Sequence, residues 1–176
     1  DIHTSRALRC LVDDRKGGFY LGTGKGLYHK TKDKLSLFQD DEELLSDDIY
    51  GIDFSDQGEL WIGGLGGITV YNAETDKRIR NITPHEGLST IWVRCIQKAP
   101  DGTMWVGTDL GITRFKDDLP SLRHSRRWLL SDNVRDIAFD RNGNAWIATA
   151  RGVSAIKKKP ITLAQKAEYY QNILYK

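Results

Sequence analysis

The feature that most constrains the fold of this chain is an internal repeat. A glycine-containing turn, an aromatic residue within a short apolar segment and a second glycine recur four times. The aromatic residues are Tyr20, Trp61, Trp105 and Trp146, spaced 41, 44 and 41 residues apart. The second glycine follows six positions later each time, as Gly26, Gly67, Gly111 and Gly152. This period predicts one supersecondary unit that buries its apolar faces by stacking on copies of itself.

Each unit consists of strand-length apolar segments separated by turns. In the third unit, Val93–Ile96 precedes an Asp101-Gly102 turn, which leads into the aromatic segment and then into Ile112–Phe115. Asp or Asn beside Gly is typical of tight hairpins, because Gly adopts the positive φ that such turns need. A more polar outer strand is expected after the third segment of the first three units, at 35–39, 78–83 and 122–128. Four strands in about 40 to 45 residues predict the blade of an all-β propeller, with four blades in this chain.

Composition excludes several other classes of protein. A helical solenoid of similar period would need apolar residues at a spacing of 3.6, which these segments lack. The 26 Lys and Arg residues nearly balance the 24 Asp and Glu residues. We therefore expect no nucleic-acid partner, since such proteins normally carry a basic surface. No apolar run approaches the roughly 20 residues that a membrane span needs, so no membrane span is expected.

The repeats resemble a known family. Val-Arg-x-Ile, Asp-x-x-Gly-x-x-Trp-Ile-Gly-Thr and Gly-Ile-x-x-Phe form a pattern similar to the two-component regulator propeller repeat, over roughly Ser5 to Ile156. The third unit matches best; the first has Tyr20 in place of Trp, and the fourth has Ala148 in place of Gly. The resemblance implies the periplasmic or extracytoplasmic sensor region of a hybrid histidine kinase, as found in Bacteroidetes. It also implies a non-catalytic module that responds to a glycan.

We expect two parts in the chain. Residues 1–159 would form the blades, at about 5–40, 46–84, 89–128 and 131–159, and residues 160–176 would form a C-terminal α-helix. Thr162 and Gln165 have the spacing of a capping box, and Leu163, Ala167, Tyr170 and Leu174 would share one helix face. This stripe must bury against something, and the apolar Ile173-Leu174-Tyr175 at its end favours a link to a downstream domain over a helix packed on the propeller rim.

The ring is expected to be open. The last unit lacks an outer strand, and the N-terminus begins almost on the first strand, so it supplies no spare strand to complete the last blade. Open outer blades expose sheet surfaces that favour association. The chain therefore either belongs to a longer propeller or pairs with another copy of itself, and a closed four-blade monomer is the alternative.

Candidate binding residues come from the loops. If the connections between blades share one face with the loops between second and third strands, the residues of interest are Lys25, His85, Trp92, Asp109, Trp128 and Arg151. Trp92 and Trp128 lie outside the repeated aromatic position, where an indole could stack on a sugar ring of an oligosaccharide. The alternatives are ordinary solvated loop tips and, for the two Trp residues, filling between blades. Trp61, Trp105 and Trp146 are expected in the core by their repeat position.

No catalytic or metal-binding pattern is found. The four His residues are dispersed, and the acidic segment 40–48 lacks the ordered carboxylate frame of a calcium loop. No Ser or Cys stands in a nucleophile motif, so neither an enzyme nor a cofactor is expected. Cys10 and Cys95 hold equivalent positions two units apart, which argues against a mutual disulfide.

Three functions remain open at this stage. The first is a ligand-recognition module of a signalling protein. The second is a protein–protein scaffold or assembly propeller, and the third is an accessory propeller of a carbohydrate-active enzyme.

Overall fold

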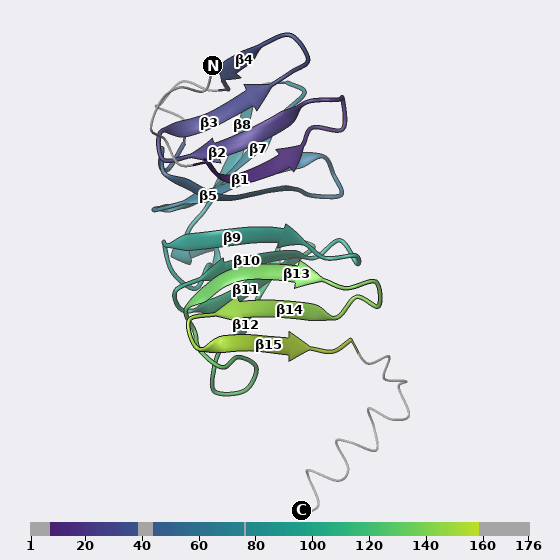
Figure 1. Ribbon diagram of the computed structural model, residues 1–176. Coiled ribbons are helices and arrows are strands. Elements are labelled where there is room, and N and C mark those ends of the chain that lie inside the picture. Colours follow the sequence, from purple (N-terminus) through teal and green to yellow (C-terminus); the bar gives the residue numbers. More distant parts are fainter. Residues whose placement is uncertain (1–7, 39–43, 76, 159–176) are drawn as a thin grey trace, which may run out of the picture.

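The computed structural model describes residues 8–38, 44–75 and 77–158 and shows an all-β chain of consecutive antiparallel sheets (Figure 1). The first sheet contains β1 (Leu8–Asp13), β2 (Phe19–Thr23), β3 (Gly26–Lys30) and β4 (Leu35–Leu37). The second contains β5 (Ile49–Phe54), β6 (Glu59–Gly64), β7 (Gly67–Asn72) and β8 (Lys77–Ile82). The third contains β9 (Val93–Lys98), β10 (Met104–Thr108), β11 (Gly111–Lys116) and β12 (Leu119–Arg123). The fourth contains β13 (Val134–Phe139), β14 (Ala145–Thr149) and β15 (Gly152–Ile156).

The turns follow from the repeated polar residues and glycines. Between β10 and β11, the Thr108 hydroxyl accepts from Leu110 N at 3.1 Å and donates to Gly111 O at 2.8 Å. Gly111 has a φ of 96°, and a Cβ there would lie 2.4 Å from Arg123 O on β12. A side chain would therefore separate the third strand from the outer strand, which explains why the repeat keeps Gly at this position.

Successive blades bury one apolar cluster at each boundary between them. β5 packs on β1, β9 on β5 and β13 on β9, so the sheets follow one another in chain order (Figure 1). The three clusters are distinct, and each combines residues of two neighbouring blades. The aromatic residues of the repeat cross these boundaries: the Trp61 ring lies 5.5 Å from Phe115, and the Trp105 ring lies 5.3 Å from Phe139. Each blade is thus stabilised mainly by its neighbours, as expected for a propeller.

The four predicted blades are confirmed, with differences in detail. Three blades have four strands, and the fourth has three within the described residues, in agreement with the missing outer strand. The outer strand predicted at 122–128 is wrong in position, since β12 is Leu119–Arg123. Asp117 and Asp118 both adopt positive φ, 50° and 61°, and this two-residue hairpin starts the strand earlier. A short 3₁₀ helix, η1 (Pro84–Glu86), was not predicted; Thr83 and Glu86 cap it reciprocally.

Two expectations concern helices: the C-terminal α-helix and the absence of a membrane-spanning segment. The C-terminal α-helix predicted for residues 160–176 lies outside the described residues and stays a prediction. Within the described residues no helix is long and apolar enough to cross a membrane.

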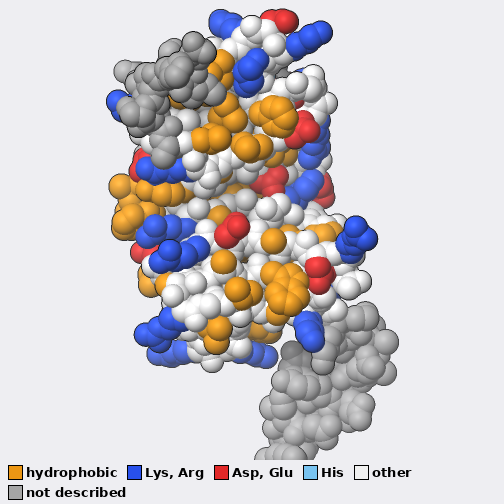
Figure 2. All heavy atoms as spheres, viewed as in Figure 1, with side chains coloured by type: hydrophobic (Ala, Val, Ile, Leu, Met, Phe, Trp, Pro, Cys, Tyr) orange, Lys and Arg blue, Asp and Glu red, His pale blue; other side chains and the backbone are white. Residues whose placement is uncertain are grey.

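The two outermost blade faces are exposed at the positions that are buried elsewhere. The expectation that Trp146 lies in the core is wrong: it is 47% exposed, whereas Trp61 and Trp105 are 2% and 5% exposed. Val153 is 61% exposed, although its equivalent Ile112 is fully buried. At the other end, Leu8, Leu11 and Phe19 are exposed where the third blade buries Val93, Ile96 and Met104. Figure 2 shows apolar side chains on the surface of both the first and the fourth sheet. We call these surfaces the two end faces.

Candidate functional site

The connections between blades share a face with the hairpins joining second and third strands. Gly26 N donates to Asp47 O at 2.6 Å, Gly66 N to Ile91 O at 2.8 Å and Gly111 N to Asp132 O at 2.7 Å. Each bond ties a hairpin tip to the connection that leads into the next blade. The shared face assumed from the sequence is therefore real, and we call it the loop face.

The structure places five of the six candidate residues on elements of the loop face. Lys25, Asp109 and Arg151 stand in the hairpin tips of the first, third and fourth blades. His85 lies within η1, and Trp92 forms an isolated bridge with Leu65. His85 and Trp92 lie in the same connection between blades and the other three in separate blades, and within the described part of the chain no hydrogen bond or ion pair joins any two of the five.

Trp92 is part of a small exposed apolar surface. Leu65 and Ile91 are both 48% exposed, and Trp92 is 38% exposed. The Arg94 guanidinium lies 4.4 Å from the centre of the Trp92 ring and covers one of its faces. Leu65, Ile91 and Trp92 form what we call the loop-face patch, whose backbone is fixed by the Leu65–Trp92 bridge.

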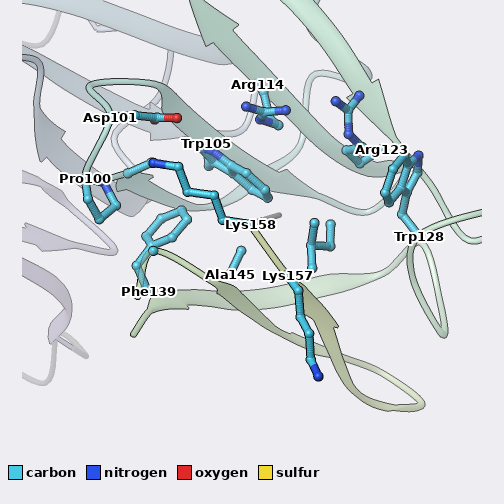
Figure 3. A pocket seen from close by; sticks show the side chains of 13 residues that line it. Pro100, Asp101, Trp105, Arg114, Arg123, Trp128, Phe139, Ala145, Lys157 and Lys158 are labelled. Carbon is cyan, nitrogen blue, oxygen red and sulfur yellow. The ribbon is translucent and has the colours of Figure 1, made fainter. Parts of the chain in front are cut away.

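Trp128, the sixth candidate, lies in a different place. Its amide closes a turn after β12 by donating to His124 O at 2.9 Å, and the indole lines a cavity of about 250 Å³ between the third and fourth blades. Figure 3 shows Trp105 at the centre of this rim pocket, Trp128 and Arg123 on one side, and Asp101 and Pro100 on the other. The lining also includes Arg114, Phe139, Ala145, Ile156 and Lys158. None of the other five candidates lines it.

The indoles of the rim pocket support guanidinium groups. The Arg114 guanidinium lies 4.6 Å from the centre of the Trp105 ring. Arg123 and Arg127 lie 5.0 Å and 4.9 Å from the centre of the Trp128 ring. Such cation–π contacts stabilise the cation and orient it at the same time. The two Trp residues therefore act as platforms for positive charge.

These cations are crowded and poorly neutralised. Burial lowers the pKa of Arg114, and burial together with the charges of Arg114 and Arg127 lowers that of Arg123. The Nε of Arg114 is buried and has no hydrogen-bond partner among the described residues. Asp101 is the carboxylate of the lining: burial raises its pKa, but hydrogen bonds from Thr103 and the charges of Lys158 and Arg114 outweigh this and lower it.

The equivalent places at the other two boundaries are neutralised by the protein itself. Between the second and third blades, Arg80 pairs with Glu59 at 3.3 Å and with Asp118 at 2.7 Å. Within the first blade, His29 pairs with Asp14 at 2.8 Å and stacks on Tyr20. In the described part of the chain, no ion pair of this kind is formed by Arg114, Arg123 or Lys158 at the third boundary.

Sequence reasoning predicted Trp128 but missed the arginines around it. Arg114 pairs across the strands with Trp105, at the position that Val70 occupies opposite Trp61. A cation directly opposite a core Trp was a usable signal. Arg123 gave no comparable signal, because its role depends on where β12 ends.

The described residues contain no group of three or more His, Cys, Asp and Glu side chains able to hold a metal ion. Cys10 and Cys95 are both free, as expected. Burial raises the pKa of each thiol to about 12, so both stay protonated at neutral pH. A thiol that stays protonated is a poor nucleophile.

Comparison with known proteins shows which families and folds the repeats are similar to. The family model of the two-component regulator propeller matches residues 87–109 and 129–151. No curated protein matches the sequence. Among solved structures, the chain is similar to the extracellular domain assigned to a hybrid two-component system of B. thetaiotaomicron, with 24% identity and a TM-score of 0.76 over 85% of this chain and 21% of that one.

Two further solved structures show how widely the fold is shared. The extracellular domain assigned to a one-component system of B. thetaiotaomicron has 20% identity and a TM-score of 0.72 over 91% of this chain and 23% of that one. Virginiamycin B lyase from Staphylococcus aureus has 13% identity and a TM-score of 0.58 over 87% of this chain and 56% of the lyase. The chain therefore spans about a fifth of the two B. thetaiotaomicron chains. The family model and the blade architecture confirm the resemblance expected from the sequence: two of the four repeats match the model of the two-component regulator propeller.

Proposed function

We propose that this chain is a non-catalytic ligand-recognition module of an extracytoplasmic signalling sensor and that its ligand is an oligosaccharide. The rim pocket carries this proposal, because two indoles and several polar groups converge there on a cavity large enough for a sugar ring. The repeat type supports the signalling role. The extracellular domains with the same fold support a location outside the cytoplasm.

The fold suits recognition by a fixed surface. β10, β11 and β14 belong to paired sheets whose facing side chains are buried, so Trp105 has little freedom to move. Trp128 is partly exposed at the edge of the pocket, and its turn is held by the backbone bond to His124. A ligand binding between them loses little affinity to ordering of the protein.

Calorimetry with a panel of neutral and acidic oligosaccharides tests this function. We expect binding to at least one member, and Trp128→Ala should weaken it about tenfold, because the variant removes an indole that lines the pocket and supports Arg123 and Arg127. Trp146→Ala is the matched control, because this Trp is also exposed but does not line the rim pocket. Equal losses in both variants, or no binding to any oligosaccharide, would contradict the proposal.

We further propose that each end face docks another blade of the same repeat type. The exposed Trp146 and Val153 occupy positions that pack on the following blade elsewhere, and the exposed Leu8 and Leu11 occupy positions that pack on the preceding one. In the intact protein these would be the remaining blades of a longer propeller; in a preparation of this chain alone, they would come from a second copy.

Light scattering over a range of concentrations tests this docking. Self-association that Val153→Asp abolishes is the expected result. A monomer at all concentrations, with unchanged elution for Val153→Asp, would contradict it.

The loop-face patch favours a second function, in which the propeller is an assembly scaffold for another protein. An exposed Trp beside two exposed aliphatic residues is typical of interface centres. The variant Trp92→Ala separates the two functions, because it should impair protein docking and leave oligosaccharide binding in the rim pocket unchanged.

A further inference from the structure

We propose that the rim pocket binds an acidic sugar, with the carboxylate or sulfate of the ligand held by Arg114 and Arg123. This inference rests on the proposed function and names its ligand class. It has its basis in the charge of the pocket, the orientation of its cations and the comparison between the three blade boundaries.

The charge of the pocket calls for an anion. Arg114, Arg123 and Lys158 line the cavity, and Arg127 lies over the same indole as Arg123. Against them the lining offers the single carboxylate of Asp101. Among the described residues, none of these four cations forms an ion pair. An oxyanion between the two lining guanidiniums would relieve their mutual repulsion and accept charge-assisted hydrogen bonds.

The orientation of the cations argues against a neutral sugar as the preferred ligand. Stacking of a sugar needs an open indole face, but Arg114 covers a face of Trp105. Arg123 and Arg127 both lie against Trp128. Because the indoles already hold guanidiniums in place, recognition depends on these guanidiniums, whose planar donors match carboxylate and sulfate oxygens.

The other boundaries serve as internal comparisons. At the boundary of the second and third blades, protein carboxylates bind Arg80 from two sides. In the first blade, Asp14 binds His29. The third boundary differs because Arg114 stands where the second blade has Val70, and among the described residues it forms no ion pair with Asp101, the carboxylate of the lining. The negative charge that completes this place therefore comes from a ligand.

Asp101 makes the ligand a hydroxylated anion. Figure 3 places Asp101 on the side of the pocket opposite Arg123 and Trp128. A carboxylate at neutral pH only accepts hydrogen bonds, so it favours hydroxyl donors and disfavours a second negative group. A sugar acid suits both sides of the pocket, with its charged group at the arginines and its hydroxyls at Asp101. An inorganic anion without hydroxyl groups to donate suits only the arginine side.

Calorimetry on the full chain at low and physiological salt tests the inference. The probes are a glucuronate-containing disaccharide, a sulfated disaccharide, a neutral glucose disaccharide and inorganic sulfate. We expect the tightest binding from one of the acidic disaccharides, about tenfold tighter than the neutral one and weaker at higher salt. Arg114→Gln and Arg123→Gln should each weaken that binding about tenfold.

Arg126→Gln is the matched control, because Arg126 is an exposed arginine of the segment between β12 and Trp128 and does not line the pocket. Thermal unfolding of each variant shows whether it still folds. If Arg114→Gln does not fold, Arg123→Gln still tests the inference.

The possible outcomes separate this inference from the proposed function. Neutral and acidic disaccharides binding equally, with no effect of Arg114→Gln or Arg123→Gln, would overturn the acidic ligand and leave oligosaccharide recognition standing. Inorganic sulfate binding as tightly as the acidic disaccharides would overturn the role of the sugar and of Asp101. No binding of any disaccharide would overturn both proposals.

Discussion

The same repeat position is buried in one blade and exposed in another, which provides a direct test of how blades stabilise each other. Trp105 packs between the third and fourth blades and is 5% exposed, whereas Trp146 lies on an end face and is 47% exposed. Both are the repeated aromatic residue on the second strand of a blade, and each pairs with the equivalent residue of the third strand, Arg114 or Ala155. Trp105→Ala and Trp146→Ala therefore remove the same side chain from two different surroundings.

The exposures set the expected difference. A fully buried Trp removes about 250 Å² from water, so the two side chains differ by about 100 Å² of burial. At about 25 cal/mol per Å² this corresponds to about 2.5 kcal/mol of unfolding free energy. Trp105→Ala also leaves a cavity between two blades, which adds to this difference, so we expect it to cost about 5 kcal/mol and Trp146→Ala about 1.5 kcal/mol.

Urea unfolding, followed by both circular dichroism and fluorescence, measures these values. Agreement of the two signals shows whether the transition is cooperative, which repeat proteins do not always satisfy. Trp105→Phe is a useful control: the Trp105 Nε1 is buried without a hydrogen-bond partner among the described residues, so its loss should cost less than the alanine change. Equal costs for the two alanine variants would refute the reasoning, since they would show that burial between blades does not stabilise this fold.

Three further predictions concern other features of the blades. Gly107→Ala should cost about 1 to 3 kcal/mol in urea unfolding, because a Cβ there would lie 2.6 Å from a methyl group of the next blade's inner strand, whereas Ala148→Gly at the equivalent end-face position should change little. Hydrogen bonds to the carboxylate of Asp140, chiefly from Asn144, lower its pKa from 3.8 to about 2; this group therefore stabilises the fold above pH 3.8 and loses that effect as the pH falls toward 2, so Asp140→Asn should flatten the acid-unfolding curve in this range. Burial raises the pKa of the Cys95 thiol to about 12, so a thiol reagent at pH 8 should modify it only at the rate of unfolding, and fast labelling in the folded chain would contradict its placement.

The strands of each blade could be predicted because the repeat presents the same local pattern four times. Turn glycines, aromatic positions and apolar segments all fix local geometry, and the predicted hairpins are found. The outer strand of the third blade was placed about three residues late. Its start depends on two Asp residues in positive φ, Asp117 and Asp118, which carry no glycine signal.

The binding site could be predicted only in part. Trp128 stood out because it breaks the repeat pattern, and the structure places it in a cavity. Its partners could not be predicted, since the pocket brings together residues of β10, β11, β12 and the chain after β15. Contacts of this kind depend on how far one blade reaches over the next, which no single unit encodes.

The wrong prediction for Trp146 shows the physical limit of predicting burial in a repeat protein from the repeat position alone. The repeat fixes which strand face an aromatic residue occupies, and in this respect all four units agree. Burial of that residue requires a second surface, which the adjoining blade supplies. Ala148 fits this view: Gly107 at its position lies too close to the next blade for a side chain, whereas Ala148 is tolerated on an end face. In the docking proposed above, the following blade would have to lie slightly farther from Ala148 than Val134 lies from Gly107, or carry a smaller residue than Val134 at that position.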